Sequence, residues 1–173
     1  MGFSRGGQAT LYASLKRFHR LWNTSGIQFA AYVPFYPDCS TTFLTDDDLD
    51  DRPIRIFHGT PDDENPVARC KAYVGRLRSA GRDVQLTEYP NAQHAFDNPL
   101  GSPTPLVAPL QTVRGCPIRE EPEGQLINAA TKQLFTYRDS CVATDGHTGY
   151  DAAATRAAHQ AVGEFLRAVL KLS

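Results

Sequence analysis

A serine near the start of the chain has the setting of a catalytic nucleophile. Ser4 lies in Gly-Phe-Ser-Arg-Gly-Gly at residues 2–7, which fits Gly-x-Ser-x-Gly, the pattern of a nucleophile elbow. In such an elbow a strand turns sharply into a helix, and the serine hydroxyl stands clear of a strained backbone. Gly2 and Gly6 lack a Cβ atom, so we expect them to let strand and helix approach closely. Glycine-rich turns without a catalytic role also fit the pattern, so residues farther along must decide.

Asp62 and His94 could complete a catalytic triad with this serine. A serine hydroxyl becomes a useful nucleophile when a base takes its proton, and histidine suits that role with a reference pKa of about 6.5. A carboxylate must then hold the imidazole in the correct tautomer. The order Ser4, Asp62, His94 is nucleophile, acid, histidine, unlike the order in chymotrypsin or subtilisin. The backbone N–H of Arg5, at the expected helix start, is the predicted oxyanion donor.

Each of these residues also has an interpretation without catalysis. Ser4 could be a turn serine, Asp62 could form an Asx turn or cap a helix, and His94 could be a loop histidine with satisfied hydrogen bonds. Asp63 competes with Asp62 for the role of the acid. The three residues together, in the required order and each after a predicted strand, favour the triad.

Among the other histidines, His147 is the alternative base. It lies in Asp-Gly-His-Thr-Gly-Tyr at residues 145–150, where it could line a pocket. The remaining histidines fall on predicted helices or end a predicted strand, which makes them weaker candidates: His19, His58 and His159.

One helix and one strand are predicted directly after the elbow. Residues 8–22 carry apolar side chains at steps of three and four, which predicts a single helix with one buried stripe. That stripe consists of Leu11, Leu15, Phe18 and Trp22. Residues 27–33 form a short, almost continuous apolar run, typical of a strand buried on both faces of a parallel sheet.

Two further strands and a second helix follow. Strands are predicted over residues 53–58 and 84–89, and the helix between them begins near Val67 and ends before Gly81. Strands that alternate with helices imply right-handed crossovers and a parallel sheet. Such sheets bind ligands at the carboxyl ends of their strands, where all three candidate catalytic residues would lie.

The segment from residue 99 to residue 150 interrupts this alternation. It contains six prolines and no repeat, and a stretch of this kind is usually functional or a surface excursion. Residues 125–135 could form a short helix or a hairpin. A final helix is predicted over residues 151–170, with Asp151 as its N-cap. We therefore expect residues 1–173 to form a single, partial domain that contains the irregular excursion.

Composition and charge exclude several classes of protein. The 18 Lys and Arg residues nearly balance the 19 Asp and Glu residues, so no nucleic-acid partner is expected. The chain has no apolar run long enough to cross a membrane and no secretory signal pattern. The acidic run at residues 45–51 lacks the glycine and final glutamate of an EF-hand, and we expect a solvated loop there.

The four cysteines lack the spacing of a zinc site. Cys70 falls on the apolar face of a predicted helix, where we expect a small buried hydrophobic residue. Cys116 and Cys141 flank a loop-rich segment and could form a disulfide if the protein is exported. The compartment expected by default is the cytoplasm.

These motifs resemble the dienelactone hydrolase-like family of α/β-hydrolases. The resemblance covers residues 1–98 well and the last helix loosely, and it rests on residues 2–7, 58–66, 70–81 and 89–97. It implies the C-terminal part of an α/β-hydrolase fold, with a mostly parallel sheet, flanking helices and the N-terminal strands missing. It also implies Asp62 rather than Asp63 as the acid, His94 as the base, and a small ester or lactone as substrate. No metal or organic cofactor is needed.

Two features differ from the pattern of that family. The namesake enzymes have a cysteine nucleophile, whereas this chain has Ser4, which favours a general ester or lactone hydrolase. The strands that should precede the elbow, and supply a second oxyanion donor, are also absent. We therefore expect a missing N-terminal segment or a homo-oligomer. The alternatives are a catalytically silent module that associates through its sheet edge, or a fragment of a prolyl-type peptidase.

Overall fold

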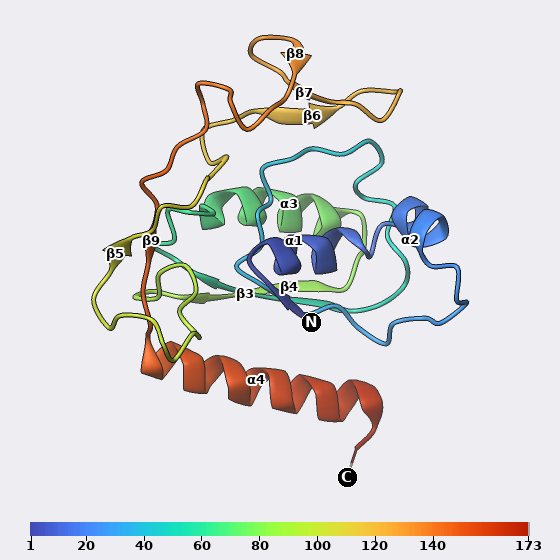
Figure 1. Cartoon of the computed structure of the whole chain (residues 1–173). Coiled ribbons are helices and arrows are strands. Elements are labelled where there is room, and N and C mark those ends of the chain that lie inside the picture. Colours follow the sequence, from blue (N-terminus) through green and yellow to red (C-terminus); the bar gives the residue numbers. More distant parts are fainter. Residues whose placement is uncertain (173) are drawn as a thin grey trace.

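The computed structural model describes residues 1–172, and a parallel four-stranded sheet forms their centre (Figure 1). The sheet has the order β1-β2-β3-β4, and every neighbouring pair is parallel. Its strands are β1 (Gly2–Phe3), β2 (Pro34–Phe35), β3 (Ile54–Gly59) and β4 (Val84–Tyr89). The predicted parallel sheet is confirmed, and β3 and β4 lie where the sequence places them.

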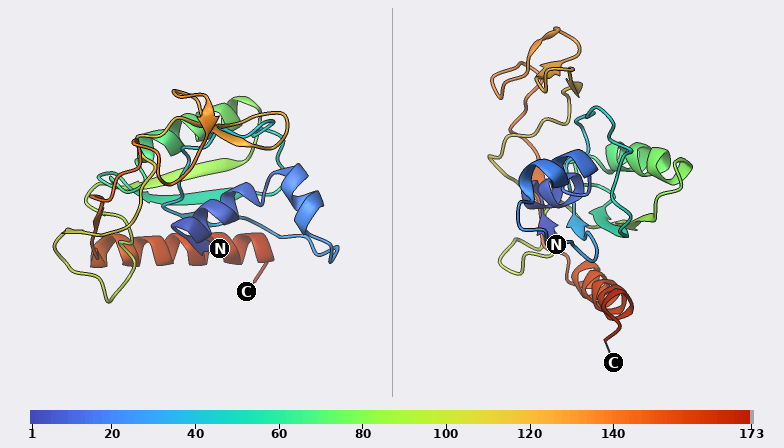
Figure 2. Two further views of the ribbon diagram at one scale, coloured as in Figure 1. Left: turned by 45° about the horizontal axis from the view of Figure 1, so that its top comes forward. Right: turned by 90° about the vertical axis from the view of Figure 1, so that its right-hand side faces the viewer.

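Helices cover both faces of this sheet (Figures 1 and 2). On one face lie α1 (Arg5–Tyr12) and α3 (Val67–Ser79), and α2 (Lys16–Trp22) continues from α1 at the side of the molecule. The long C-terminal helix α4 (Ala152–Leu170) covers the opposite face. Asp151 caps α4, since its side chain accepts hydrogen bonds from the second and third backbone N–H groups of the helix.

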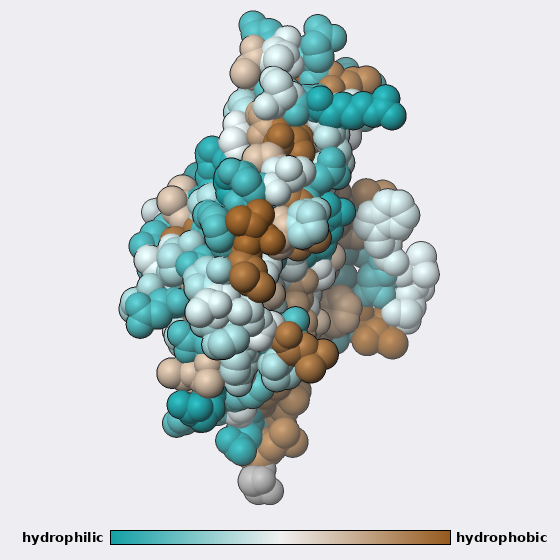
Figure 3. Space-filling view, turned by 60° about the vertical axis from the view of Figure 1, so that its left-hand side comes forward, coloured by the Kyte–Doolittle hydropathy of each residue, from teal (hydrophilic) through white to brown (hydrophobic). Residues whose placement is uncertain are grey.

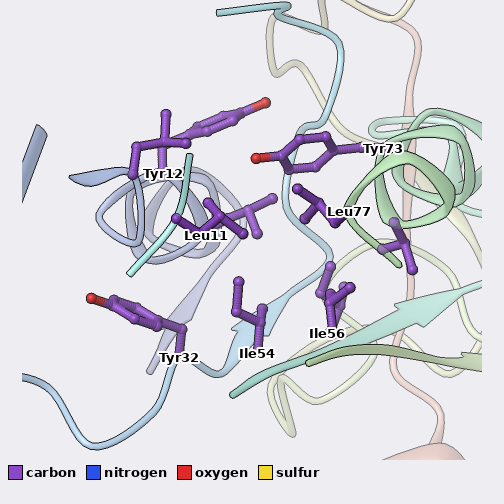
Figure 4. Close-up of a cluster of buried hydrophobic side chains, with 11 residues drawn as sticks. Leu11, Tyr12, Tyr32, Ile54, Ile56, Tyr73 and Leu77 are labelled. Atoms are coloured by element: carbon purple, nitrogen blue, oxygen red, sulfur yellow. The ribbon is translucent and has the colours of Figure 1, made fainter. Parts of the chain in front are cut away.

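Two apolar core clusters lie one on each side of the sheet, and a third, smaller cluster is formed by Val113, Cys116 and Ile118. The first joins α1, α3 and β3 through Leu11, Ile56 and Leu77, each fully buried (Figure 4). The second joins the sheet to α4 through side chains such as Phe35 and Ala158. Packing on both faces leaves the central strands almost continuously buried: both residues of β2 are buried, and in β3 only Arg55 is partly exposed.

The single helix predicted over residues 8–22 is wrong, because the structure has two. The Ser14 hydroxyl donates to the Leu11 carbonyl, which competes with helical hydrogen bonding at this point. Leu15 then adopts an extended conformation between α1 and α2. Trp22, expected in the buried stripe, is 80% exposed.

The strand predicted over residues 27–33 is also wrong over most of its length. Regular pairing occurs only at β2, with an isolated bridge from Tyr32 to Ile54 just before it. Ile27 is 67% exposed, and Phe29 packs edge-on against the Tyr32 ring. The apolar run is therefore mainly a surface stretch, which a pattern of residue types does not distinguish from a short buried strand.

The segment from residue 99 to residue 150, called the excursion below, forms small sheets beside and above the main body. Strands β5 (Leu106–Val107) and β9 (His147–Thr148) form an antiparallel pair. The remaining three strands form a second antiparallel sheet, seen at the top of Figure 1, and consist of β6 (Ile118–Glu120), β7 (Leu126–Asn128) and β8 (Gln133–Leu134). Of the two interpretations of residues 125–135, the hairpin is confirmed.

The hydrophobic side chains of the left-hand face lie in small groups among hydrophilic ones (Figure 3). Leu100 is 93% exposed, and Leu106 and Val107 are more than half exposed.

None of the helices of residues 1–172 combines the length and apolar character needed to cross a bilayer.

Two disulfides fix loops of the chain. Cys116 is bonded to Cys141 inside the excursion. The expectation for Cys70 was incomplete, because this fully buried residue of α3 is bonded to Cys39 in the loop after β2. The two residues are 31 positions apart, and their proximity depends on how that loop crosses α3, which the sequence pattern does not reveal.

The acidic run at residues 45–51 is more than the solvated loop that we expected. Asp46 is buried and forms an ion pair with Arg76 of α3 at 2.6 Å. Asp50 accepts a hydrogen bond of 2.6 Å from the Tyr32 hydroxyl. These carboxylates tie the loop to the first apolar cluster, so they stabilise its position rather than only solvating it.

Candidate active site

Ser4 stands at the turn between β1 and α1 in strained backbone geometry. Its φ is 52° and its ψ is −119°, a combination that few residues other than glycine adopt. The Ser4 N–H donates to the Phe35 carbonyl of β2 at 3.1 Å, and its own carbonyl accepts from Gln8 at 2.8 Å. The elbow predicted from residues 2–7 is therefore present as a strand-to-helix turn.

Two glycines make the tight turn possible. A Cβ atom on Gly2 would clash with the Gly6 carbonyl, so the expectation for Gly2 is confirmed. The expectation for Gly6 is wrong, because a Cβ there would meet no atom of residues 1–172 within 4 Å. Gly7 is the second close contact, since a Cβ on it would clash with the Phe35 carbonyl.

The structure brings Ser4, Asp62 and His94 into one hydrogen-bonded series. His94 Nδ1 lies 2.9 Å from Asp62 Oδ2, and His94 Nε2 lies 2.9 Å from Ser4 Oγ. Asp62 follows β3 and His94 follows β4, so all three residues lie at the carboxyl edge of the sheet. Asp62 and His94 are only 3% and 2% exposed.

The Asp62 carboxylate is held from both of its oxygens. Oδ1 accepts a hydrogen bond of 2.8 Å from the Asn65 N–H, so the residue also forms the turn that the alternative interpretation describes. Burial raises the pKa of Asp62, but hydrogen bonding and charge from His58 and His94 outweigh it and hold the pKa below its usual value. The carboxylate is consequently ionised at neutral pH.

His58 is a neighbour of the site that the sequence analysis ranked as weak. It is fully buried, and its Nε2 lies 2.7 Å from the Asn65 carbonyl and 3.4 Å from Asp62 Oδ2. The contact with the Asn65 carbonyl is the stronger hydrogen bond, and the longer, weaker one stabilises the Asp62 carboxylate. Two sequence signals mark this position: it ends a predicted strand, and it begins the segment 58–66 on which the family resemblance partly rests.

Backbone and aromatic contacts fix the orientation of His94. The His94 carbonyl accepts a hydrogen bond of 3.1 Å from Gly149, which follows β9 of the excursion. The ring of Tyr36 stands edge-on to the imidazole, with 4.7 Å between centroids. The Tyr36 hydroxyl donates to Asp97, and burial raises the pKa of Tyr36 far above its usual range. This tyrosine is therefore a neutral wall beside the imidazole.

Asp63 and His147 form a separate pair. His147 Nδ1 lies 2.8 Å from Asp63 Oδ2, and the His147 N–H donates to Asp63 Oδ1 at 2.7 Å. The two alternative candidates thus bind each other, whereas Asp62 binds His94. The last two histidines lie on helices as predicted, His19 in α2 and His159 in α4.

The Arg5 N–H is available as an oxyanion donor. Arg5 is the first residue of α1, and its N–H has no hydrogen-bond acceptor within residues 1–172. The helix N-terminus adds a positive electrostatic contribution at this point. One backbone donor and one helix terminus therefore lie directly beside Ser4.

A narrow cavity of about 30 Å³ adjoins Ser4, and most residues around it were missed by the sequence analysis. They come from α1, from the loops after β2 and β3, and from the excursion: Gln8, Asp38, Glu64, Asn65, Gln111, Val113 and Tyr137. Burial raises the pKa of Glu64. Their types and positions carry no motif, and only the fold brings them together.

The described residues contain no group of three or more His, Cys, Asp or Glu side chains that could hold a metal ion. The series of Ser4, His94 and Asp62 has the geometry that nucleophilic catalysis by serine requires.

A parallel sheet with helices on both faces, and a nucleophile elbow between one of its strands and the following helix, defines the α/β-hydrolase class. Within this class the chain belongs to the dienelactone hydrolase family, whose family model matches residues 1–170. The predicted family and fold class are thereby confirmed. Among curated proteins, none matches the chain.

Several solved structures are similar to part of the chain. A proposed dienelactone hydrolase from Klebsiella pneumoniae subsp. pneumoniae MGH 78578 has 24% identity and a TM-score of 0.42, with 56% of this chain and 40% of that chain covered. Esterase PE8 has 20% identity and a TM-score of 0.42, with coverage of 56% and 42%. MGS-M1, an α/β-hydrolase enzyme from a Medee basin deep-sea metagenome library, has 19% identity and a TM-score of 0.41, with coverage of 56% and 40%. The chain thus spans about 40% of their length.

Proposed function

We propose that this protein is a serine acyl hydrolase that cleaves an ester or lactone through an acyl-enzyme. The observation that carries the proposal is the series Asp62–His94–Ser4, with both hydrogen bonds at 2.9 Å and the serine at a φ of 52°. Membership of a hydrolase family supports the general class of reaction. The ester or lactone bond, the serine nucleophile and the triad are the specific parts of the proposal.

In the first half of the reaction Ser4 Oγ attacks the carbonyl carbon while His94 Nε2 takes the hydroxyl proton. The negative charge that develops on the carbonyl oxygen is stabilised by the Arg5 N–H and the α1 terminus. Ionised Asp62 stabilises the imidazolium. The tetrahedral intermediate then collapses, the C–O bond to the alcohol breaks, and His94 returns its proton to the departing oxygen.

In the second half a water molecule replaces the alcohol. His94 takes a proton from this water, which attacks the carbonyl carbon of the acyl-enzyme. Collapse of the second intermediate breaks the bond to Ser4 Oγ, and His94 protonates that oxygen. The products are a carboxylic acid and the regenerated enzyme, so atoms and charges balance without a cofactor.

A substitution at Ser4 tests the proposal directly. Hydrolysis of p-nitrophenyl acetate should disappear in Ser4→Ala and persist in Ser25→Ala, whose serine lies in an exposed turn far along the chain from the site. A fluorophosphonate probe should label Ser4 alone, as judged by peptide mass spectrometry. Wild-type turnover in Ser4→Ala would contradict the proposal. Absence of labelling in the folded protein would support a catalytically silent module instead.

We also propose an oxidising compartment for the protein. The two disulfides, Cys39–Cys70 and Cys116–Cys141, support this proposal, because such bonds are rare in reducing compartments. Alkylation of free thiols before proteolysis, in protein isolated without reductant, should leave all four cysteines unlabelled. Full alkylation of either pair would contradict it.

A further inference from the structure

A second and larger cavity adjoins the narrow one beside Ser4. It has a volume of about 510 Å³ and lies between α1, the loop after β2, and the β6-β7-β8 sheet of the excursion. The two cavities share five lining residues: Arg5, Gln8, Asp38, Val113 and Tyr137. Because these residues border both spaces, the larger cavity begins where the candidate nucleophile stands.

The larger cavity is apolar away from Ser4. Its walls are formed by Tyr12 of α1, Phe43 of the loop after β2, and Ile118, Leu126 and Phe135 of the excursion. Its only charged lining residues are Arg5 and Asp38, and both also border the narrow cavity. A volume of this size is in the range that binds small organic ligands, so the cavity is matched to an apolar group rather than to water alone.

The charges beside Ser4 give no surplus of positive charge. Arg5 carries one positive charge, with its guanidinium 5.4 Å from the centre of the Tyr137 ring. Asp38 and Glu64 oppose it with two carboxyl groups. An anionic substrate would therefore meet at least as much repulsion as attraction, whereas a neutral ester meets neither.

The excursion is fixed in place, so the apolar cavity is formed before a ligand binds. The disulfide Cys116–Cys141 crosses it, and Arg17 of α2 forms an ion pair with buried Glu120. Thr42 joins β6 to the body through two backbone hydrogen bonds of 2.9 Å. A pre-formed pocket does not require its walls to be ordered on binding, which favours affinity.

We propose that the excursion builds the substrate pocket, and that the substrate is a neutral ester with a large apolar group, either aromatic or a medium-length alkyl chain. The ester carbonyl lies beside Ser4, and the apolar group extends between α1 and the β6-β7-β8 sheet. The apolar group belongs to either the acyl or the alcohol part, because both are bonded to the same carbonyl. This inference rests on the proposed function of the Ser4 site.

Two substrate series test the inference, and together they show whether the acyl part or the alcohol part of the ester carries the apolar group. p-Nitrophenyl octanoate should have a kcat/KM at least about 10-fold above p-nitrophenyl acetate if the acyl part fills the cavity. Octyl acetate should exceed ethyl acetate by a similar factor if the alcohol part fills it. Mono-p-nitrophenyl suberate, which has the length of the octanoate and a terminal carboxylate, should lose most of the gain. Equal rates within both series would overturn the inference.

Substitution at Tyr137 locates the selectivity in the cavity. The Tyr137 side chain is 47% exposed and lines both cavities. Tyr137→Ala should lower the ratio of long-chain to short-chain kcat/KM about 5- to 10-fold, because an aromatic wall is lost. Leu134→Ala is the matched control, since Leu134 is an exposed residue of β8 outside both cavities. A ratio unchanged in Tyr137→Ala would contradict the inference.

A binding measurement separates this inference from the proposed function. Calorimetric titration of the Ser4→Ala variant with p-nitrophenyl octanoate should show binding with a negative heat-capacity change, the mark of apolar burial. Adding Tyr137→Ala should weaken it about 5- to 10-fold. If Ser4→Ala still hydrolyses the ester and still binds p-nitrophenyl octanoate, the proposed function is wrong but the pocket is not. Absence of binding, together with no chain-length preference, would defeat the pocket alone.

Discussion

Two aspartate–histidine pairs begin at the adjacent residues Asp62 and Asp63. They have the same residue types and similar contact distances, but they differ in burial and in their further partners. The Asp62 carboxylate lies 2.9 Å from His94 Nδ1, and the Asp63 carboxylate lies 2.8 Å from His147 Nδ1. The side chains of the first pair are at most 2% exposed, whereas those of the second are 39% and 42% exposed. Only in the first pair does the other imidazole nitrogen contact a serine hydroxyl. A short Asp–His contact alone therefore does not distinguish the two pairs, whereas burial and a third partner do.

The two pairs also act on different parts of the molecule. Asp62–His94 connects the loops after β3 and β4 at the edge of the sheet. Asp63–His147 connects the β3 loop to β9 of the excursion, and Arg114 adds a hydrogen bond of 2.8 Å to the Asp63 carbonyl. The second pair thus holds the excursion beside the site, and we expect it to contribute to stability more than to chemistry.

Replacement of the two histidines should give the largest contrast. His94→Ala removes the proposed base and should lower kcat by about 10⁴- to 10⁶-fold, as removal of a triad histidine does elsewhere. His147→Ala should change kcat by less than about 10-fold, because its ring contacts Asp63 rather than the nucleophile. Steady-state kinetics with p-nitrophenyl acetate measures both. Comparable losses in the two variants would eliminate the distinction between the pairs.

Replacement of the two aspartates should give a smaller contrast in the same direction. Asp62→Asn keeps the shape of the side chain but no longer stabilises the correct tautomer, and a loss of roughly 10³- to 10⁴-fold in kcat is expected. Asp63→Asn should cost less than about 10-fold. It should lower the free energy of unfolding by about 1 kcal/mol or less, the usual contribution of an exposed ion pair. Urea unfolding measures that second effect, and a kcat lower in Asp63→Asn than in Asp62→Asn would reverse the assignment.

The sequence predicted the parts of the fold whose patterns are strong. The helix α3 and the long C-terminal helix were located correctly, because their apolar periodicity spans enough residues to be unambiguous. The six-residue strand β3 was also located correctly, whereas the run of similar length at residues 27–33 was not. The break after α1 was not predicted, since it depends on one side-chain hydrogen bond from Ser14 to the Leu11 carbonyl. The contact between Cys39 and Cys70 depends on the path of a loop, which residue types do not encode locally.

The candidate site was predictable to a similar extent. Ser4, Asp62 and His94 were identified by motif and order, and their catalytic roles stay predictions until kinetics test them. Residue types alone did not separate Asp62 from Asp63, because adjacent turn residues point in different directions only once the turn is folded. Tyr137 of the cavity wall lies more than 130 positions from Ser4 in the sequence, and no local pattern connects the two residues.

Glu64, the residue after the two paired aspartates, extends the comparison to a carboxyl group without a histidine. Its side chain is buried, and its Oε2 has no hydrogen-bond partner within residues 1–172. Burial raises the pKa of Glu64 above that of the unfolded chain. Because the pKa of Glu64 is higher in the folded protein, protonation of Glu64 stabilises the fold. This stabilisation is complete below the unfolded pKa of about 4.3 and is lost as the pH rises through the pKa of the folded protein. The folded protein is therefore less stable with Glu64 ionised than with a neutral side chain at this position.

Glu64→Gln should accordingly stabilise the protein at pH 7.5, where the variant avoids a buried charge. The expected gain in the free energy of unfolding is about 0.5 kcal/mol or more, at the lower end of single-substitution effects. At pH 4 the gain should shrink or change sign, because the wild-type carboxyl group is then protonated. Urea unfolding at both pH values measures the difference, and Glu123→Gln, at an exposed glutamate, is the control for the substitution itself. A gain equal at both pH values would show that side-chain shape, and not charge, distinguishes Glu64 from its two paired neighbours.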